Sequence, residues 1–109
     1  MPVRADPDLL LKSLADPTRR TLFERLCNEG ELNVRVLTEQ SGVSQPAVSK
    51  HLGVLKRAGL VTERRDGREV HYGARPKALT PLVTWLQFHT RFWEGRFDRL
   101  ESLLKRMDQ

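Results

Sequence analysis

The chain has 109 residues, with 19 Lys or Arg against 14 Asp or Glu, which gives a formal net charge of +5. This length suits one domain and leaves no room for a separate catalytic domain, and the single cysteine excludes an intramolecular disulfide or a multi-cysteine metal cage. No run approaches the ~18 apolar residues of a membrane span, and the N-terminus lacks the apolar region of a signal peptide, so we expect a cytoplasmic protein with no membrane partner.

Two helices are predicted near the N-terminus. The dipeptides Asp6-Pro7 and Asp16-Pro17 each place a side-chain acceptor before a proline, which is a common start of a helix. We expect helices over about 7–14 and 17–29, the second with an apolar stripe that packs into the core. Cys27 lies on this second helix and is expected to be a small buried residue.

The next segment has the pattern of a helix-turn-helix. Asn33 can cap a helix that runs to about Ser41, and Ser44 can cap a second helix that runs to Ala58. Between them, Gly42 suits the left-handed conformation of a tight turn. Two capped helices around a glycine turn predict a helix-turn-helix.

A β-hairpin is predicted after these two helices. The segments 60–65 and 68–74 flank Asp66-Gly67, which is a strong signal for a two-residue hairpin loop. This register would place Arg65 opposite Arg68 at the exposed tip.

The arginines of this tip have two interpretations. A like-charge pair such as Arg65 and Arg68 is unfavourable without a counterion, and a DNA phosphate between them would remove that cost. The alternative is that Asp66 and Glu69 neutralise the tip locally, with Arg64 opposite Glu69 in the predicted register. We favour the phosphate contact, because basic loops often contact the DNA backbone.

A long last helix is predicted from Thr80-Pro81 to about Met107, since a capping residue again precedes a proline. Its apolar residues recur at spacings of three, four and seven and form a stripe larger than this small core can cover. We expect this stripe to pack in a dimer, and the alternative is an apolar effector pocket between subunits. The interface residues predicted on this helix are Leu82, Trp85, Leu86, His89, Trp93, Phe97 and Leu100.

Polar residues lie on the outer side of the helix that begins after Ser44. Gln45 and Ser49 are one turn apart near its N-terminus, where a recognition helix meets base edges in the major groove. Gln45 and Ser49 can hydrogen-bond to bases, Lys50 suits a guanine or a phosphate, and His51 can donate to a phosphate. The alternative for these residues is an ordinary solvated helix face.

A family resemblance covers more than half of the chain. The run LNVRVLTEQSGVSQPAVSKHLGVLKRAGLVTERRDGREVHY resembles the signature of the ArsR/SmtB family of bacterial winged-helix repressors, and LADPTRRTLFERL resembles that family's second helix. The most specific piece is SQPAVSKHLGVLKRAGLV. The resemblance implies a mainly α fold with a small β-hairpin, that is, a winged helix-turn-helix. It also implies a homodimer through the N- and C-terminal helices that binds an inverted repeat near its own promoter.

The resemblance also implies roles along the chain. We expect a single domain over 1–109, with dimerisation helices at 1–15 and 80–107, the helix-turn-helix at 33–58 and the wing at 60–74. Leu10 is the interface residue predicted on the first helix. The residues predicted to contact bases are Ser44, Gln45, Ser49 and Lys50, and those predicted to contact phosphates are His51, Lys56, Arg57, Arg64, Arg65 and Arg68. The predicted partners are double-stranded DNA and a second copy of the chain.

The family's metal sensing is not expected to carry over. Metal sensors that this chain resembles place cysteines where it has Asn33 and Arg35, and the last helix offers one histidine, His89, without ligating neighbours at helical spacing. We therefore expect no metal site and no cofactor, and an unidentified small-molecule effector is left open.

Catalysis has little support in the sequence. Ser49 and His51 are two residues apart on a helix and so point to different faces, and no carboxylate lies at helical spacing to orient His51. We expect a sequence-specific DNA-binding transcriptional repressor rather than an enzyme. The alternative is a winged-helix protein-interaction module that no longer binds DNA.

Overall fold

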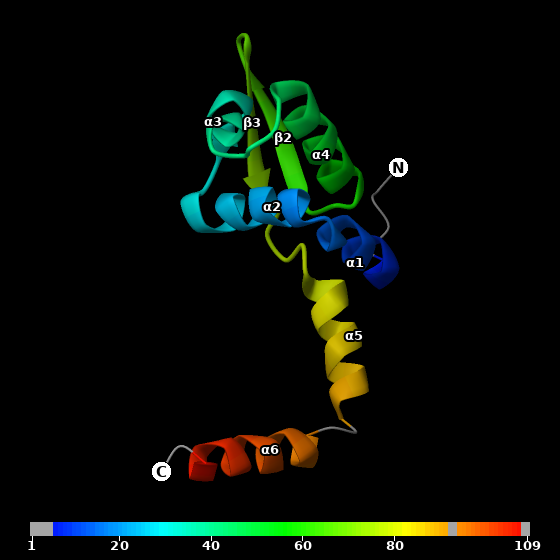
Figure 1. The fold of residues 1–109 in the computed structure, drawn as a ribbon. Coiled ribbons are helices and arrows are strands. Elements are labelled where there is room, and N and C mark those ends of the chain that lie inside the picture. Colours follow the sequence, from blue (N-terminus) through cyan, green and yellow to red (C-terminus); the bar gives the residue numbers. More distant parts are fainter. Residues whose placement is uncertain (1–5, 92–93, 108–109) are drawn as a thin grey trace.

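The structure, a computed structural model, describes residues 6–91 and 94–107. Helices α1 to α4 and a three-stranded antiparallel sheet form one body, from which α5 and then α6 extend (Figure 1). In chain order the elements are α1 (Pro7–Ala15), α2 (Pro17–Glu29), β1 (Leu32–Asn33), α3 (Val34–Glu39), α4 (Gln45–Arg57), β2 (Val61–Asp66), β3 (Glu69–Ala74), α5 (Thr80–Thr90) and α6 (Glu94–Met107).

The first four helices begin where their capping residues predict. A side-chain oxygen of each capping residue accepts a hydrogen bond from a backbone N–H in the first turn, at 3.0 Å for Asp6, 2.9 Å for Asp16, 2.8 Å for Asn33 and 3.3 Å for Ser44. The α3–α4 turn contains Gly42 at φ +77°, a left-handed conformation that favours glycine. The helix-turn-helix is thus confirmed, although α3 ends two residues earlier than the predicted Ser41.

The core lies between these helices and the inner face of the sheet. Apolar residues from α1, α2, α3 and α4 meet residues of β2 and β3 there, which holds the helix-turn-helix against the hairpin. The buried apolar residues are Leu10, Leu22, Phe23, Leu26, Leu37, Val48, Leu52, Leu55, Ala58, Leu60, Val61 and Tyr72.

Leu10 belongs to this core, which corrects its predicted place in a dimer interface. Leu10 is 1% exposed within the single chain, so it has almost no surface to offer to a second copy. The apolar neighbours of Leu10 on α1, Leu9 and Leu11, are the exposed ones. A run of three leucines does not reveal which of them faces inward.

The prediction that Cys27 is buried is also wrong. The stripe of α2 that faces the core ends at Leu26, and each further residue turns by 100° around the helix axis. Cys27 therefore lies on the exposed side. The pKa of its thiol is raised by partial burial and by the nearby charge of Glu24.

The register of the hairpin differs from the prediction by two residues. The loop is Gly67–Arg68 instead of Asp66–Gly67, because Asp66 pairs with Glu69 in the ladder. The predicted loop was of the Asp-Gly type, which needs positive φ at both positions. The observed loop needs it only at Gly67, which has φ +63°, as in turns with glycine at the first central position.

The shift changes the neighbours of the wing arginines. Arg64 lies opposite His71 and Arg65 lies opposite Val70, so the predicted pairs Arg64–Glu69 and Arg65–Arg68 do not form. Arg65 and Arg68 therefore need no phosphate between them to relieve a cross-strand repulsion. Because the shift is by two residues, each side chain keeps its predicted face of the sheet.

A third strand, β1, was not predicted. It has two residues, and Leu32 and Asn33 pair with Tyr72 and His71 of β3, which places β3 in the centre of the sheet. Two residues are too few to show the alternation that identifies a strand.

The C-terminal region forms two helices instead of one. The helix α5 ends at Thr90 and α6 begins at Glu94, with Gly95, a poor helix former, directly after that start. Thr80 is the first helical residue and not the predicted cap, since Leu79 occupies the capping position without a side-chain hydrogen bond. In the described part of the chain, no helix combines the length and the apolar character needed to cross a membrane.

Candidate nucleic-acid interface

The helix α4 divides into a buried and an exposed face, as predicted. Val48, Leu52 and Leu55 recur at helical spacing and are each 0% exposed. Gln45 and Ser49 lie on the opposite side, exposed and one turn apart. The core thus holds the helix by one face and leaves the other free to contact a ligand.

A hollow of about 330 Å³ lies beside this exposed face of α4. It is bounded by α4, by the start of α3 and by the start of β3, three elements that lie next to one another at one end of the molecule (Figure 1). The structure therefore brings Gln45 and Ser49 together with the wing residue Arg68. The lining residues are Asn33, Val34, Arg35, Gln45, Ser49, Arg68, Glu69 and Val70.

Arg35 is the cation in this lining that was not among the predicted DNA contacts. It is exposed on α3, the first helix of the helix-turn-helix. An exposed cation on that helix is a signal that could have identified it, because this helix crosses the DNA backbone in helix-turn-helix complexes.

The wing arginines lie on different faces of the sheet. Arg65 alternates with Arg64, so it lies on the helix-facing side, where its Nε is 3.7 Å from Glu63 Oε1. Arg64 lies on the outer side and donates hydrogen bonds to the Glu31 carboxylate, the shortest at 2.6 Å. Arg68 is exposed in the hairpin loop. Arg65 and Arg68 are therefore better placed than Arg64 to reach a DNA strand that lies beside α4.

Lys56 at the end of α4 is joined to the wing. Its Nζ lies 2.9 Å from Glu63 Oε2, and this hydrogen bond holds the pKa of the Glu63 carboxyl below its usual value. The Tyr72 hydroxyl donates to the same oxygen at 3.3 Å, and burial, then the Glu63 charge, raises the pKa of Tyr72. This contact fixes the wing relative to the recognition helix.

The other residues predicted to bind DNA are spread along α4. Ser44 uses its hydroxyl to cap the helix, and Lys50 is exposed on the first half of the helix. Arg57 is exposed at the C-terminal end. His51 is half-buried near Asp16, whose pKa is lowered by the Arg19 backbone hydrogen bond and, to a smaller extent, by His51.

Comparison with known proteins identifies the family. The model of the family described as "Bacterial regulatory protein, arsR family" matches residues 16–63, which contain the helix-turn-helix. An HTH-type transcriptional regulator of Mycobacterium tuberculosis, Rv2034, is 46% identical over 87 residues, which cover 80% of this chain and 78% of that protein. The chain belongs to the ArsR family. It is a DNA-binding transcription regulator with a winged helix-turn-helix fold, and not an enzyme.

Solved structures of ArsR-type proteins share this fold. The transcriptional repressor BigR from Xylella fastidiosa is 40% identical, with a TM-score of 0.60 over 72% of this chain and 80% of that chain. The homodimeric winged helix-turn-helix domain of Mb0332 from Mycobacterium bovis, described as a possible ArsR-family regulator, is 26% identical. Its TM-score is 0.62 over 77% of both chains.

The aromatic part of α5 is exposed in this ArsR-family chain. Trp85 is 40%, Leu86 45% and Phe88 70% exposed. The His89 ring lies 4.6 Å from the Trp85 ring and 5.1 Å from the Phe88 ring. Trp85, Leu86 and Phe88 thus form an exposed apolar surface on α5 that also includes the His89 ring.

The remaining predicted interface residues differ in their surroundings. Leu82 is partly buried against the chain's own core, whereas Leu100 on α6 is exposed. Trp93 and the side chain of Phe97 lie outside the described residues.

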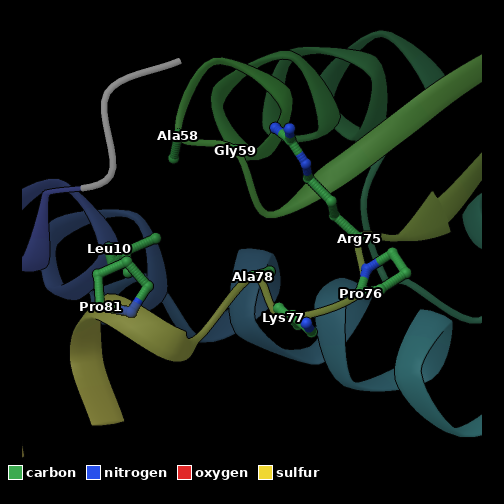
Figure 2. A pocket seen from close by; sticks show the side chains of 8 residues that line it. All are labelled: Leu10, Ala58, Gly59, Arg75, Pro76, Lys77, Ala78 and Pro81. Carbon is green, nitrogen blue, oxygen red and sulfur yellow. The ribbon is translucent and has the colours of Figure 1, made fainter. Parts of the chain in front are cut away.

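A second hollow, of about 270 Å³, lies between α1, the end of α4 and the segment that leads into α5 (Figure 2). Arg75 extends from that segment toward the turn at Gly59, and Lys77 beside it has a left-handed φ of +62°. Leu10 and Pro81 form the opposite wall. This hollow adjoins both the recognition helix and α5.

Proposed function

We propose that this ArsR-family chain is a repressor that binds an inverted-repeat operator as a homodimer. The observation that carries the proposal is the exposed face of α4, where Gln45 and Ser49 border a hollow shared with the wing. In helix-turn-helix complexes the N-terminal residues of the second helix contact base edges in the major groove. Gln45, Ser49 and Lys50 would read bases in this way, with Ser44 at the start of the helix.

Phosphate contacts would come from cations around this face. Arg68 lines the hollow, and Arg65 lies opposite the lining residue Val70 in the hairpin. Arg57 is exposed farther along α4. Phosphate contacts position a protein on the duplex without reading sequence. His51 and Lys56 would contribute from positions where each already has an acidic neighbour.

The homodimer is supported by the apolar surface of α5 and by the homodimeric relative. An exposed surface with Trp85, Leu86 and Phe88 is typical of a protein interface, since aromatic residues are enriched there. Two-fold symmetry would place the two α4 helices in successive major grooves, about 34 Å apart. The operator would then contain two inverted half-sites at that spacing.

Regulation without the family's metal site is part of the proposal. The metal sensors that this chain resembles have cysteines at the positions of Asn33 and Arg35. Neither the Asn33 amide nor the Arg35 guanidinium can replace a thiolate as a zinc ligand. The protein would act in the cytoplasm, as a constitutive repressor or in response to an unidentified small molecule.

The experiment is a binding titration with two fluorescent duplexes of equal length. One carries the inverted repeat from the DNA upstream of the gene, and the other has a random sequence. We expect salt-sensitive binding to both and tighter binding to the inverted repeat, with typical specific-to-random ratios of about 10³ or more. Equal affinity for both duplexes would contradict an operator at that site, and no binding to either would favour the protein-interaction module.

A further inference from the structure

Two arginines from different elements flank the base-reading residues of α4. Arg35 comes from α3 and Arg68 from the hairpin loop, and both line the hollow that also contains Gln45 and Ser49. The two cations are 33 residues apart in the chain and are brought to one hollow by the packing of α3, α4 and β3. Their placement brackets the face of α4 that is proposed to enter the major groove.

Arg35 and Arg68 differ from several other arginines of the fold in their ion pairing. Arg25, Arg64 and Arg65 each have an ion pair with a glutamate. Within residues 6–91 and 94–107, the structure shows no ion pair for Arg35 or Arg68.

Glu69 is the acidic residue that lines the hollow, so the position of its charge matters. It alternates with Val70 on β3, which places its side chain on the outer face of the sheet. There its carboxylate lies 3.3 Å from His71 Nε2. The lining of the hollow thus contains two cations, Arg35 and Arg68, against this one acid, whose carboxylate lies beside His71.

We propose that Arg35 is a further DNA-binding residue that contacts a backbone phosphate beside the bases read by Gln45 and Ser49. This inference rests on the proposed DNA-binding function. When the second helix of a helix-turn-helix lies in the major groove, the first helix crosses the backbone, and Arg35 is an exposed cation on that first helix. Arg35 and Arg68 then hold the DNA strand from the two sides of the hollow.

The test compares salt dependence of binding for wild type, Arg35→Ala and Arg35→Lys, on the inverted-repeat duplex and the random duplex. Each lost phosphate contact reduces the slope of log affinity against log salt by about 0.9, hence by about 1.8 for a dimer. Between 50 and 200 mM salt, the affinity of Arg35→Ala should therefore fall by a factor about twelve times smaller than the factor for wild type. Arg35→Lys should keep most of the wild-type slope, because it retains the charge.

Arg99→Ala is the matched control. Arg99 is exposed on α6, a helix that lies at the end of the molecule opposite the hairpin (Figure 1). The substitution therefore removes the same charge far from the hollow. Far-UV circular dichroism and the unfolding midpoint confirm that each variant is folded. We expect Arg99→Ala to have the slope of wild type.

The outcomes separate this inference from the proposed function. If wild type binds neither duplex, the proposed function itself fails. If wild type binds and Arg35→Ala has the same slope as wild type and Arg99→Ala, the assignment of Arg35 is wrong while the function stands. A loss of preference for the inverted repeat without a change of slope would also overturn it, because that result indicates a base contact.

Discussion

Arg64 and Glu31 form a forked ion pair across the outer face of the sheet. The Arg64 guanidinium donates from Nη2 to Glu31 Oε1 at 2.6 Å and from Nε to the same oxygen at 3.0 Å. This pair joins β2 to the segment before β1, which are 33 residues apart in the chain. Arg64 therefore helps to hold the wing in position through Glu31. A DNA phosphate would have to compete with Glu31 for the Arg64 guanidinium.

The pH dependence of stability should reveal this pair. The hydrogen bond from Arg64 lowers the pKa of Glu31 in the folded protein. A carboxyl with a depressed folded pKa adds stability above its unfolded pKa, and this stability is lost as the pH falls through the folded pKa. Wild type should therefore be more stable than Glu31→Gln at neutral pH. The difference should begin to shrink as the pH falls toward about 4.3, the unfolded pKa of a glutamate, and should vanish only below the lowered folded pKa of Glu31.

Urea unfolding of both proteins across this pH range measures the effect. Because the pair is exposed, added salt should also reduce it. Glu39→Gln is the control, since Glu39 is exposed on α3 and has no ion pair among the residues that the structure describes. A difference between wild type and Glu31→Gln that persists at acid pH would show that the Glu31 charge is not its source.

Alanine substitutions on the two faces of α4 should have different effects on stability and on DNA binding. Leu52 is fully buried, so Leu52→Ala should lower the free energy of unfolding by about 3 kcal/mol through lost burial and a cavity. Ser49 is exposed, so Ser49→Ala should change stability by less than about 0.5 kcal/mol. We expect Ser49→Ala instead to weaken discrimination between inverted-repeat and random duplexes by about 1–3 kcal/mol.

Unfolding midpoints and fluorescence anisotropy on the same preparations make this comparison. Arg65→Ala is the contrasting DNA variant, because a phosphate contact should weaken binding to both duplexes alike. Normal discrimination by folded Ser49→Ala would remove Ser49 from the base contacts.

The helical half of the fold was predictable because its signals are local. Asp6, Asp16, Asn33 and Ser44 each form their capping hydrogen bond within three residues, so neighbouring residues decide where these helices begin. The buried face of α4 also follows from helical periodicity alone. Of the candidate interface, this local information identified Gln45 and Ser49.

The remaining features depend on contacts between distant segments. Arg35 and Arg68 line the same hollow only because α3 packs beside the hairpin. The position of Arg35 on the first helix of the motif indicates a backbone contact, but no local signal indicates that Arg68 lies near it. The strand β1 exists because β3 offers it a partner. The hairpin register was missed for a local reason, since Gly67 can serve either as the second residue of one loop or as the first of another.

The observed register makes Gly67 a sensitive position. Its φ of +63° is unfavourable for residues with a Cβ, although an added Cβ would meet no atom within 4 Å. Gly67→Ala should therefore lower the free energy of unfolding by about 1–2 kcal/mol through backbone strain, and Gly67→Asn should lower it less, because asparagine tolerates this conformation.

Gly95→Ala is the matched glycine control. Gly95 lies in α6, where a Cβ also meets nothing, and alanine is the better helix former by about 1 kcal/mol. Thermal unfolding of the three variants provides the comparison. If Gly67→Ala is as stable as wild type, the hairpin in solution does not use Gly67 in a left-handed conformation.

Trp85 provides the test of the proposed dimer. Trp85 is 40% exposed, and its ring lies 4.6 Å from the His89 ring, on a helix with no residue buried in the single chain. Tryptophan residues at the centre of interfaces contribute about 2 kcal/mol or more, so Trp85→Ala should weaken dimerisation by about thirtyfold or more. Gln87→Ala is the control, because Gln87 is exposed two residues farther along α5 and so points about 200° away.

Sedimentation velocity over a dilution series measures the dissociation constant of each protein. Because Trp85 would act through dimerisation, Trp85→Ala should bind the inverted repeat weakly at low protein concentration and recover as the concentration rises. In a DNA-contact variant such as Ser49→Ala, a higher protein concentration should not restore the lost preference for the inverted repeat. Wild type that stays monomeric throughout the series would contradict the homodimer, and a dimer unaffected by Trp85→Ala would place the interface away from this face of α5.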